Sequence, residues 1–158
     1  GTQGKRGQNV INSLFLKPAA LEAKNFERYE MYAKIEKNEI LYEEFMMDDA
    51  QICLVAYGIA SRVTKNAVEQ ARKIGIKAGM IRPITLWPFP KKVLLNMADR
   101  VTAFISVELS MGQLIEDVEL SIRCKKPVYL CNRTGGMLVS EEDILTKIKE
   151  VCKRGGAV

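Results

Sequence analysis

The stretch Arg82-Pro-Ile-Thr-Leu-Trp-Pro-Phe-Pro90 holds three of the five prolines and the only tryptophan of the chain, directly after an apolar run at 76–81. Proline fixes φ near about −65° and has no backbone donor, so neither a helix nor a central strand can continue through this stretch. We therefore expect a stiff, extended loop that leaves a strand. Leu86, Trp87 and Phe89 are predicted to project from it as an interface. The alternative is that Trp87 folds back over the core of its own domain.

Apolar runs and amphipathic stretches alternate on both sides of this loop. Continuous apolar runs predict strands at 51–57, 76–81, 101–107 and 128–131, and helical periodicity fills the intervals between them. The last helix is expected to begin at Ser140-Glu-Glu-Asp143, which has the pattern of a capping box. Alternating strands and helices with short connections predict a three-layer α/β/α fold around a mostly parallel sheet of four to five strands.

The N-terminal part has a different composition. Residues 1–17 are interpreted as a linker or arm, in which the apolar run 10–16 either adds an edge strand or packs as an arm. Residues 18–48 lack glycine and any interior proline, so we expect a long N-terminal helical arm, either one kinked helix or two helices. The α/β domain is assigned to residues 49–154.

The composition excludes several classes of protein. Of 158 residues, 47% are hydrophobic and 27% charged, which is ordinary for a globular domain and argues against disorder. The net charge of +5 is spread along the chain with no arginine cluster among aromatics, so nucleic acid is not an expected partner. No apolar run reaches the about 18 residues that a membrane span needs.

The residue types that most often carry enzyme chemistry are scarce. The chain has no histidine, which removes the commonest general base and metal ligand. Its four cysteines form no C-x-x-C pair, so neither a zinc site nor an iron–sulfur cluster is expected. Reduced, structural cysteines predict a cytoplasmic protein.

In a parallel sheet, the loops after the four strands meet at one edge, where ligands bind in α/β proteins. The polar residues expected near that edge are Arg82, Glu108, Gln113, Asp117 and Arg133. Glu108 is either an acid or base with a raised pKa or, as we favour, the partner of Arg82 or Arg133 in a bond that pins the loops.

Two further loops at this edge leave alternatives open. Gly58-Ile-Ala-Ser61 either offers backbone N–H groups and a serine cap to an anion or forms an ordinary turn with a capping serine. Thr134-Gly135-Gly136 either cradles a phosphate or forms a turn that needs glycine at positive φ.

Four motifs in this order resemble a known superfamily: Ala56-Tyr-Gly58 with Ser61, then 82–90, then Val107-Glu-Leu109 with Met111-Gly-Gln113, then Asn132-Arg-Thr-Gly-Gly136. Together they resemble the transketolase C-terminal-like domain. Within it the chain is most similar to the alpha subunit of thiamine-diphosphate-dependent 2-oxoacid:ferredoxin oxidoreductases, first the 2-oxoisovalerate (branched-chain) type, then the 2-oxoglutarate or pyruvate types. The superfamily resemblance adds one antiparallel edge strand to the expected sheet.

The resemblance also implies a function. Such complexes convert 2-oxoacids to acyl-coenzyme A and pass electrons to ferredoxin, using thiamine diphosphate, Mg2+ and iron–sulfur clusters. The diphosphate lies on another subunit with a GDG motif, which this chain lacks. The resemblance thus implies a non-catalytic C-terminal assembly domain, inactive alone and without bound cofactor. Its partners would be the thiamine-diphosphate-binding beta, gamma and ferredoxin-like delta subunits. The competing hypothesis from the residues is an autonomous α/β module that binds a small molecule or anion.

Overall fold

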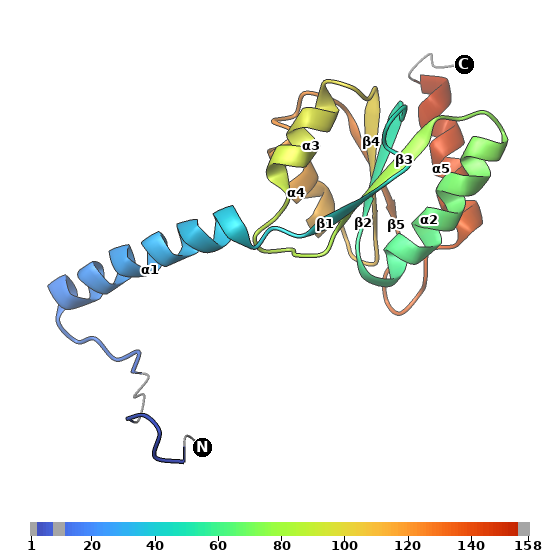
Figure 1. Ribbon diagram of the computed structural model, residues 1–158. Coiled ribbons are helices and arrows are strands. Elements are labelled where there is room, and N and C mark those ends of the chain that lie inside the picture. The colour runs from blue at the N-terminus through green and yellow to red at the C-terminus, as the bar shows by residue number, and fades with distance from the viewer. Residues whose placement is uncertain (1–2, 8–11, 155–158) are drawn as a thin grey trace.

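The computed structural model describes residues 3–7 and 12–154. In Figure 1 a helix at the N-terminal side extends away from an α/β body, in which helices cover both faces of a sheet. The elements are α1 (Pro18–Asn38), β1 (Tyr42–Phe45), β2 (Ile52–Ala56), α2 (Gly58–Lys73), β3 (Ala78–Pro83), α3 (Lys91–Ala98), β4 (Ala103–Glu108), α4 (Gln113–Ser121), β5 (Val128–Asn132) and α5 (Glu141–Arg154).

The sheet confirms the predicted fold class. Its five strands lie in the order β1-β3-β2-β4-β5, and β2 pairs in parallel with both β3 and β4, while β4 pairs in parallel with β5. Strand β1 runs antiparallel to β3 at one edge. All five residues of β2 are buried, as expected for a central strand covered by helices on both faces.

Two apolar clusters hold the three layers together. Helices α2 and α5 cover one face of the sheet, and α3 and α4 cover the other (Figure 1). On α5, the side chains of Ile144, Ile148 and Val151 recur at helical spacing and are buried in the first cluster. The core therefore lies on both sides of the sheet and leaves the strand ends free to carry loops.

The helical prediction for 18–48 is wrong in its last part. Helix α1 ends at Asn38, and Tyr42–Phe45 form the edge strand β1 instead of a second helix. The strand pairs with β3, and its Glu43 lies opposite Arg82, whose Nη1 donates to Glu43 Oε2 at 3.0 Å. Helix propensity is a weak preference that tertiary pairing overrides.

The N-terminal segment gives no edge strand within the described residues. Residues 12–17 form no strand, and residues 10 and 11 of the predicted apolar run lie outside the described part of the chain. In residues 3–7 and 12–154, none of the helices combines the length and hydropathy needed to cross a bilayer.

Candidate functional site

The loops after the parallel strands meet at what we call the carboxyl edge, formed by Tyr57 after β2 and by the loops 84–90, 109–112 and 133–140. Strands β2, β3, β4 and β5 all run in the same direction, so the predicted convergence of these loops is confirmed. Neighbouring strands lie about 4.8 Å apart. Loops of adjacent strands are therefore within reach of one another.

Glu108 organises the loop after β4. Its side chain is 1% exposed, and each carboxylate oxygen accepts two hydrogen bonds. Oε1 accepts from the Ser106 hydroxyl at 3.0 Å and from the backbone N–H of Ile115 at 3.1 Å. Oε2 accepts from the Ser110 hydroxyl and from the backbone N–H of Leu114 at 3.1 Å. Glu108 thus caps the first turn of α4 from the preceding strand.

The predicted partners of Glu108 are wrong, although its role as an anchor agrees with its contacts. Arg82 pairs with Glu43, and Arg133 pairs with Asp143, so neither arginine binds the Glu108 side chain. Burial alone would raise the pKa of Glu108. The hydrogen bonds from Ser110, Leu114, Ser106 and Ile115 outweigh that effect and hold the pKa below its usual value. Glu108 is therefore an ionised structural group and not a general acid with a raised pKa.

Gln113 and Asn132 complete the same loop. The side-chain oxygen of Gln113, an exposed residue, accepts from the backbone N–H of Met111 at 3.1 Å. The Asn132 amide donates to the Ser110 carbonyl at 2.6 Å, and the Arg133 backbone N–H donates to the Glu108 carbonyl at 3.3 Å. The structure therefore brings the loops after β4 and β5 together. Asn132 was not among the predicted residues, and its position directly after an apolar strand was the available signal.

Arg82 and Arg133 point to other partners. Arg133 forms a two-point contact with Asp143, with Nη2 at 2.7 Å from Oδ1 and Nε at 3.3 Å from Oδ2. Led by the hydrogen bond from Arg133, these contacts lower the pKa of Asp143 to about 2. Arg82 lies two strands away from Glu108, and its buried Nε has no hydrogen-bond partner in the described part of the chain.

The capping box at the start of α5 is confirmed. The backbone N–H of Ser140 donates to Asp143 Oδ2 at 3.0 Å, and the backbone N–H of Asp143 donates to Ser140 Oγ at 3.1 Å. Each side chain thus satisfies an N–H group that the helix leaves free. Because the Asp143 carboxylate also accepts hydrogen bonds from Arg133, this local motif fixes the loop after β5 to the body.

The loops at 58–61 and 134–136 were the two candidate anion sites, and in the structure both make local contacts instead. Ser61 is not the capping residue of α2. It lies in the first turn, and its hydroxyl donates to the Gly58 carbonyl at 2.7 Å. Gly135 and Gly136 both have positive φ, and the Met137 N–H donates to the Thr134 carbonyl at 3.2 Å, which makes a tight turn. A Cβ on either glycine would meet no atom within 4 Å, so these glycines serve backbone conformation.

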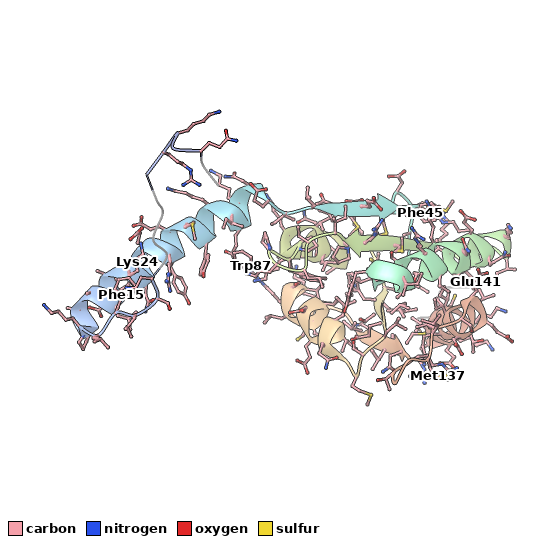
Figure 2. All side chains as sticks on the ribbon, turned by 90° about the horizontal axis from the view of Figure 1, so that it is seen from below. Phe15, Lys24, Phe45, Trp87, Met137 and Glu141 are labelled. Atoms are coloured by element: carbon pink, nitrogen blue, oxygen red, sulfur yellow. The ribbon has the colours of Figure 1, made fainter. Side chains whose placement is uncertain are left out.

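The aromatic residues of the 84–90 loop separate into one core residue and two exposed ones. Phe89 is 6% exposed and belongs to the apolar cluster under α3 and α4, so its predicted outward direction is wrong. Leu86 and Trp87 are 49% and 55% exposed. Trp87 therefore does not cover the core of its own body, which was the alternative. Figure 2 labels Trp87 on the side of the body that faces α1.

The connection between α1 and β1 is attached to this loop by backbone hydrogen bonds. The N–H groups of Ile84 and Thr85 donate to the Leu41 carbonyl at 2.9 and 3.1 Å, and the Leu41 N–H donates to Thr85 Oγ1 at 3.0 Å. The Thr85 hydroxyl donates in turn to the Pro88 carbonyl at 2.8 Å. These bonds fix where α1 leaves the body, directly beside Trp87.

Helix α1 has no buried residue, and its aromatic side chains are exposed. The rings of Tyr32 and Trp87 meet edge to face, with centroids 5.5 Å apart and planes at 78°. Tyr29 contacts Tyr32 in the same manner at 5.9 Å and 61°. The predicted site did not include these tyrosines. Their spacing of three residues, which places them on one helix face, was the available signal.

Comparisons with known proteins agree on one family. The profile of the family described as pyruvate:ferredoxin oxidoreductase core domain II matches residues 50–144. The chain is 50% identical over 144 residues to the ketoisovalerate oxidoreductase subunit VorB of Methanothermobacter marburgensis, which covers 91% of this chain and 41% of that protein. It is 35% identical over 113 residues to the 2-oxoglutarate synthase subunit KorA of Methanocaldococcus jannaschii, covering 70% and 30% of the two chains. The chain thus spans about two fifths of the length of the VorB relative.

Solved structures agree with the fold. The 2-oxoglutarate:ferredoxin oxidoreductase of Magnetococcus marinus, which was solved with 2-oxoglutarate, coenzyme A and succinyl-CoA bound, superposes with a TM-score of 0.70 at 19% identity. That match covers 86% of this chain and 24% of the other. A split-gene transketolase superposes with a TM-score of 0.62 at 18% identity, covering 70% and 41% of the two chains. The described fold and the profile match together place this chain in the pyruvate:ferredoxin oxidoreductase core domain II family.

Proposed function

We propose that this chain is the core domain II of a ketoisovalerate oxidoreductase subunit, whose complex decarboxylates branched-chain 2-oxoacids oxidatively to acyl-coenzyme A and reduces ferredoxin. The observation that carries the proposal is the 50% identity to VorB over 91% of this chain. The KorA relative of Methanocaldococcus jannaschii reaches 35% over 70% of the chain, which favours a branched-chain substrate over 2-oxoglutarate. Within that complex we assign the chain an assembly role.

The residues of the carboxyl edge do not fit a thiamine diphosphate site. Both oxygens of Glu108 already accept hydrogen bonds, from four donors in β4, the loop after it and α4. Arg133 is held by Asp143, and the described residues contain no group of three or more carboxylate, thiol or imidazole side chains arranged around a metal position. We therefore assign thiamine diphosphate, Mg2+ and the iron–sulfur clusters to other parts of the complex, on beta, gamma and delta subunits.

A reducing compartment suits the cysteines. Cys53 and Cys131 are buried thiols in β2 and β5. Burial raises the pKa of Cys131 to about 11 and that of Cys53 still further, so both remain protonated and unreactive near neutral pH. These properties support the proposal of a cytoplasmic location, where structural thiols stay reduced.

Purified residues 1–158 are expected to show no 2-oxoisovalerate-dependent reduction of a viologen dye when supplied with thiamine diphosphate, Mg2+ and coenzyme A. The reason is that the carboxyl edge offers no unoccupied carboxylate to activate the cofactor. The complete complex, assayed with the same reagents, is the positive control. Turnover that follows this chain through successive purification steps would contradict the assembly role.

Trp87→Ala is expected to weaken assembly with the partner subunits by at least about tenfold, since buried tryptophans often dominate interfaces. The melting temperature of the isolated chain should change little, because more than half of Trp87 is exposed. Sedimentation of the reconstituted complex measures the first effect, and thermal unfolding measures the second.

Phe89→Ala is the matched control from the same loop. Phe89 is buried, so its loss should cost about 3–5 kcal/mol of folding stability. The proposed interface is wrong if Trp87→Ala destabilises the chain as much as Phe89→Ala does. It is also wrong if Trp87→Ala leaves assembly with the partner subunits unchanged.

A further inference from the structure

The cleft between α1 and the 84–90 loop has a mostly aromatic lining. It is open to solvent, has a volume of about 600 Å³ and is lined by Tyr29, Tyr32, Ala33, Glu36 and Trp87. Three of these five residues are aromatic, and the only charged one is an acid. No element of the described body fills this cleft, since Trp87 and Tyr29 remain 55% and 73% exposed.

The rings form the walls of an open box. Neighbouring ring planes cross at 61° and 78°, so the three aromatic side chains do not stack flat on one another. Steeply inclined rings present both faces and edges to the space between them. The face of an aromatic ring carries negative electrostatic potential and attracts a cation placed within about 6 Å of its centre.

Glu36 adds a full negative charge to this box. It follows Tyr32 by four residues and therefore lies on the same face of α1, one turn further along. Glu36 forms no ion pair with any residue of 3–7 and 12–154, whereas Glu27 and Glu43 each form one. An apolar occupant would remove this carboxylate from water without offering it a hydrogen bond or an ion pair, which costs free energy.

We propose that this cleft, the α1–Trp87 box, binds an arginine side chain of a partner subunit. The inference rests on the proposed assembly function and identifies what the partner presents to this face. A planar guanidinium can stack on one ring while its N–H groups reach the Glu36 carboxylate, which a lysine ammonium cannot do with the same geometry. Arginine is also enriched in protein interfaces.

Trp87 is the only tryptophan, so its fluorescence reports on the box directly. Titration of residues 1–158 with Nα-acetyl-argininamide should produce a saturable change in emission, with half-saturation on the order of 10 mM for so small a probe. Nα-acetyl-citrullinamide has the same shape without the charge and should bind at least about threefold more weakly. Equal responses to the two probes would overturn the proposal, and a tighter response to Nα-acetyl-lysinamide would overturn the choice of arginine.

Two pairs of variants test the walls of the box. Glu36→Gln should lower the affinity for the arginine probe about threefold. Glu30→Gln removes the same charge from α1 outside the cleft and should change nothing. Tyr32→Ala should lower the affinity for the probe about fivefold or more. Tyr42 is an exposed tyrosine of β1 outside the cleft, so Tyr42→Ala should leave that affinity unchanged.

Saturation-transfer NMR on the probe protons gives a second reading that does not depend on Trp87 emission, and far-UV circular dichroism checks that each variant is folded. Unchanged probe binding in Glu36→Gln and Tyr32→Ala would refute the box even if Trp87→Ala weakens assembly. Conversely, probe binding combined with assembly that does not depend on Trp87 would refute the interface at Trp87 and the partner arginine with it, and would leave the box as a site for small cations only.

Discussion

Glu108→Gln is expected to lower the stability of the chain by about 3 kcal/mol, which corresponds to roughly 6–12 °C in melting temperature for a chain of this size. The reason is geometric. Each carboxylate oxygen faces one backbone N–H of α4, from Ile115 or Leu114. A glutamine has only one oxygen, so either orientation of the amide leaves an N–H group facing another donor. The serine hydroxyls can rotate, but the backbone cannot.

Glu116→Gln is the control for this prediction. Glu116 lies in the first turn of the same helix but is exposed, so its loss should cost no more than about 0.5 kcal/mol. Thermal and urea unfolding followed by circular dichroism measure both variants. A Glu108→Gln variant as stable as the parent would show that the carboxylate does not hold the loop.

The pH dependence gives an independent test of the charge state of Glu108. Because its pKa in the folded protein lies below the ordinary 4.5, the carboxylate contributes stability that is complete above about pH 4.5 and declines as the pH falls toward the folded value. The stability difference between the parent and Glu108→Gln should therefore narrow between pH 6 and pH 3. A catalytic carboxyl with a raised pKa would give the opposite trend, with the difference narrowing as the pH rises.

Gly79→Ala is expected to cost about 3 kcal/mol or more, because β3 passes very close to the turn between β1 and β2. A Cβ at residue 79 would lie 2.5 Å from the Met46 carbonyl oxygen and 2.6 Å from the Met47 sulfur. The Met47 side chain can move, but the Met46 carbonyl is held by Arg72 Nη2 at 2.6 Å. The same nitrogen donates to Asp49 Oδ1 at 2.8 Å, so the turn cannot retreat without breaking a second contact.

Gly7→Ala is the matched control, since a Cβ there meets no atom within 4 Å. Its stability should stay within about 0.5 kcal/mol of the parent. Equilibrium urea unfolding compares the two variants, and the midpoint of Gly79→Ala should fall clearly. If Gly79→Ala and Gly7→Ala unfold at the same urea concentration, the turn is more compliant than its hydrogen bonds indicate.

The carboxyl edge shows which parts of a site can be predicted from sequence. The parallel direction of the strands followed from apolar runs separated by helical periodicity, and it predicted that their loops share one edge. The pairing of β4 with β5, which brings the loops after these two strands together, comes from the structure. The partners of Glu108 did not follow, although Ser110, Leu114 and Ile115 lie within seven residues of it. The chain must turn back at Gly112, with φ of 111°, before α4 can present its N–H groups. That reversal is a backbone conformation which residue types alone do not specify.

The sequence by itself determined the local features. The capping box of Ser140 and Asp143 spans four residues, and the prolines of the 82–90 stretch restrict their own backbone wherever they are placed. The tertiary structure decided whether 42–45 is helix or strand, which of Trp87 and Phe89 is buried, and which acids pair with Arg82 and Arg133. Each of these outcomes depends on residues distant in sequence or on the direction in which a loop leaves the sheet. Propensity acts over one turn, whereas burial and pairing are set by the packing of the whole domain.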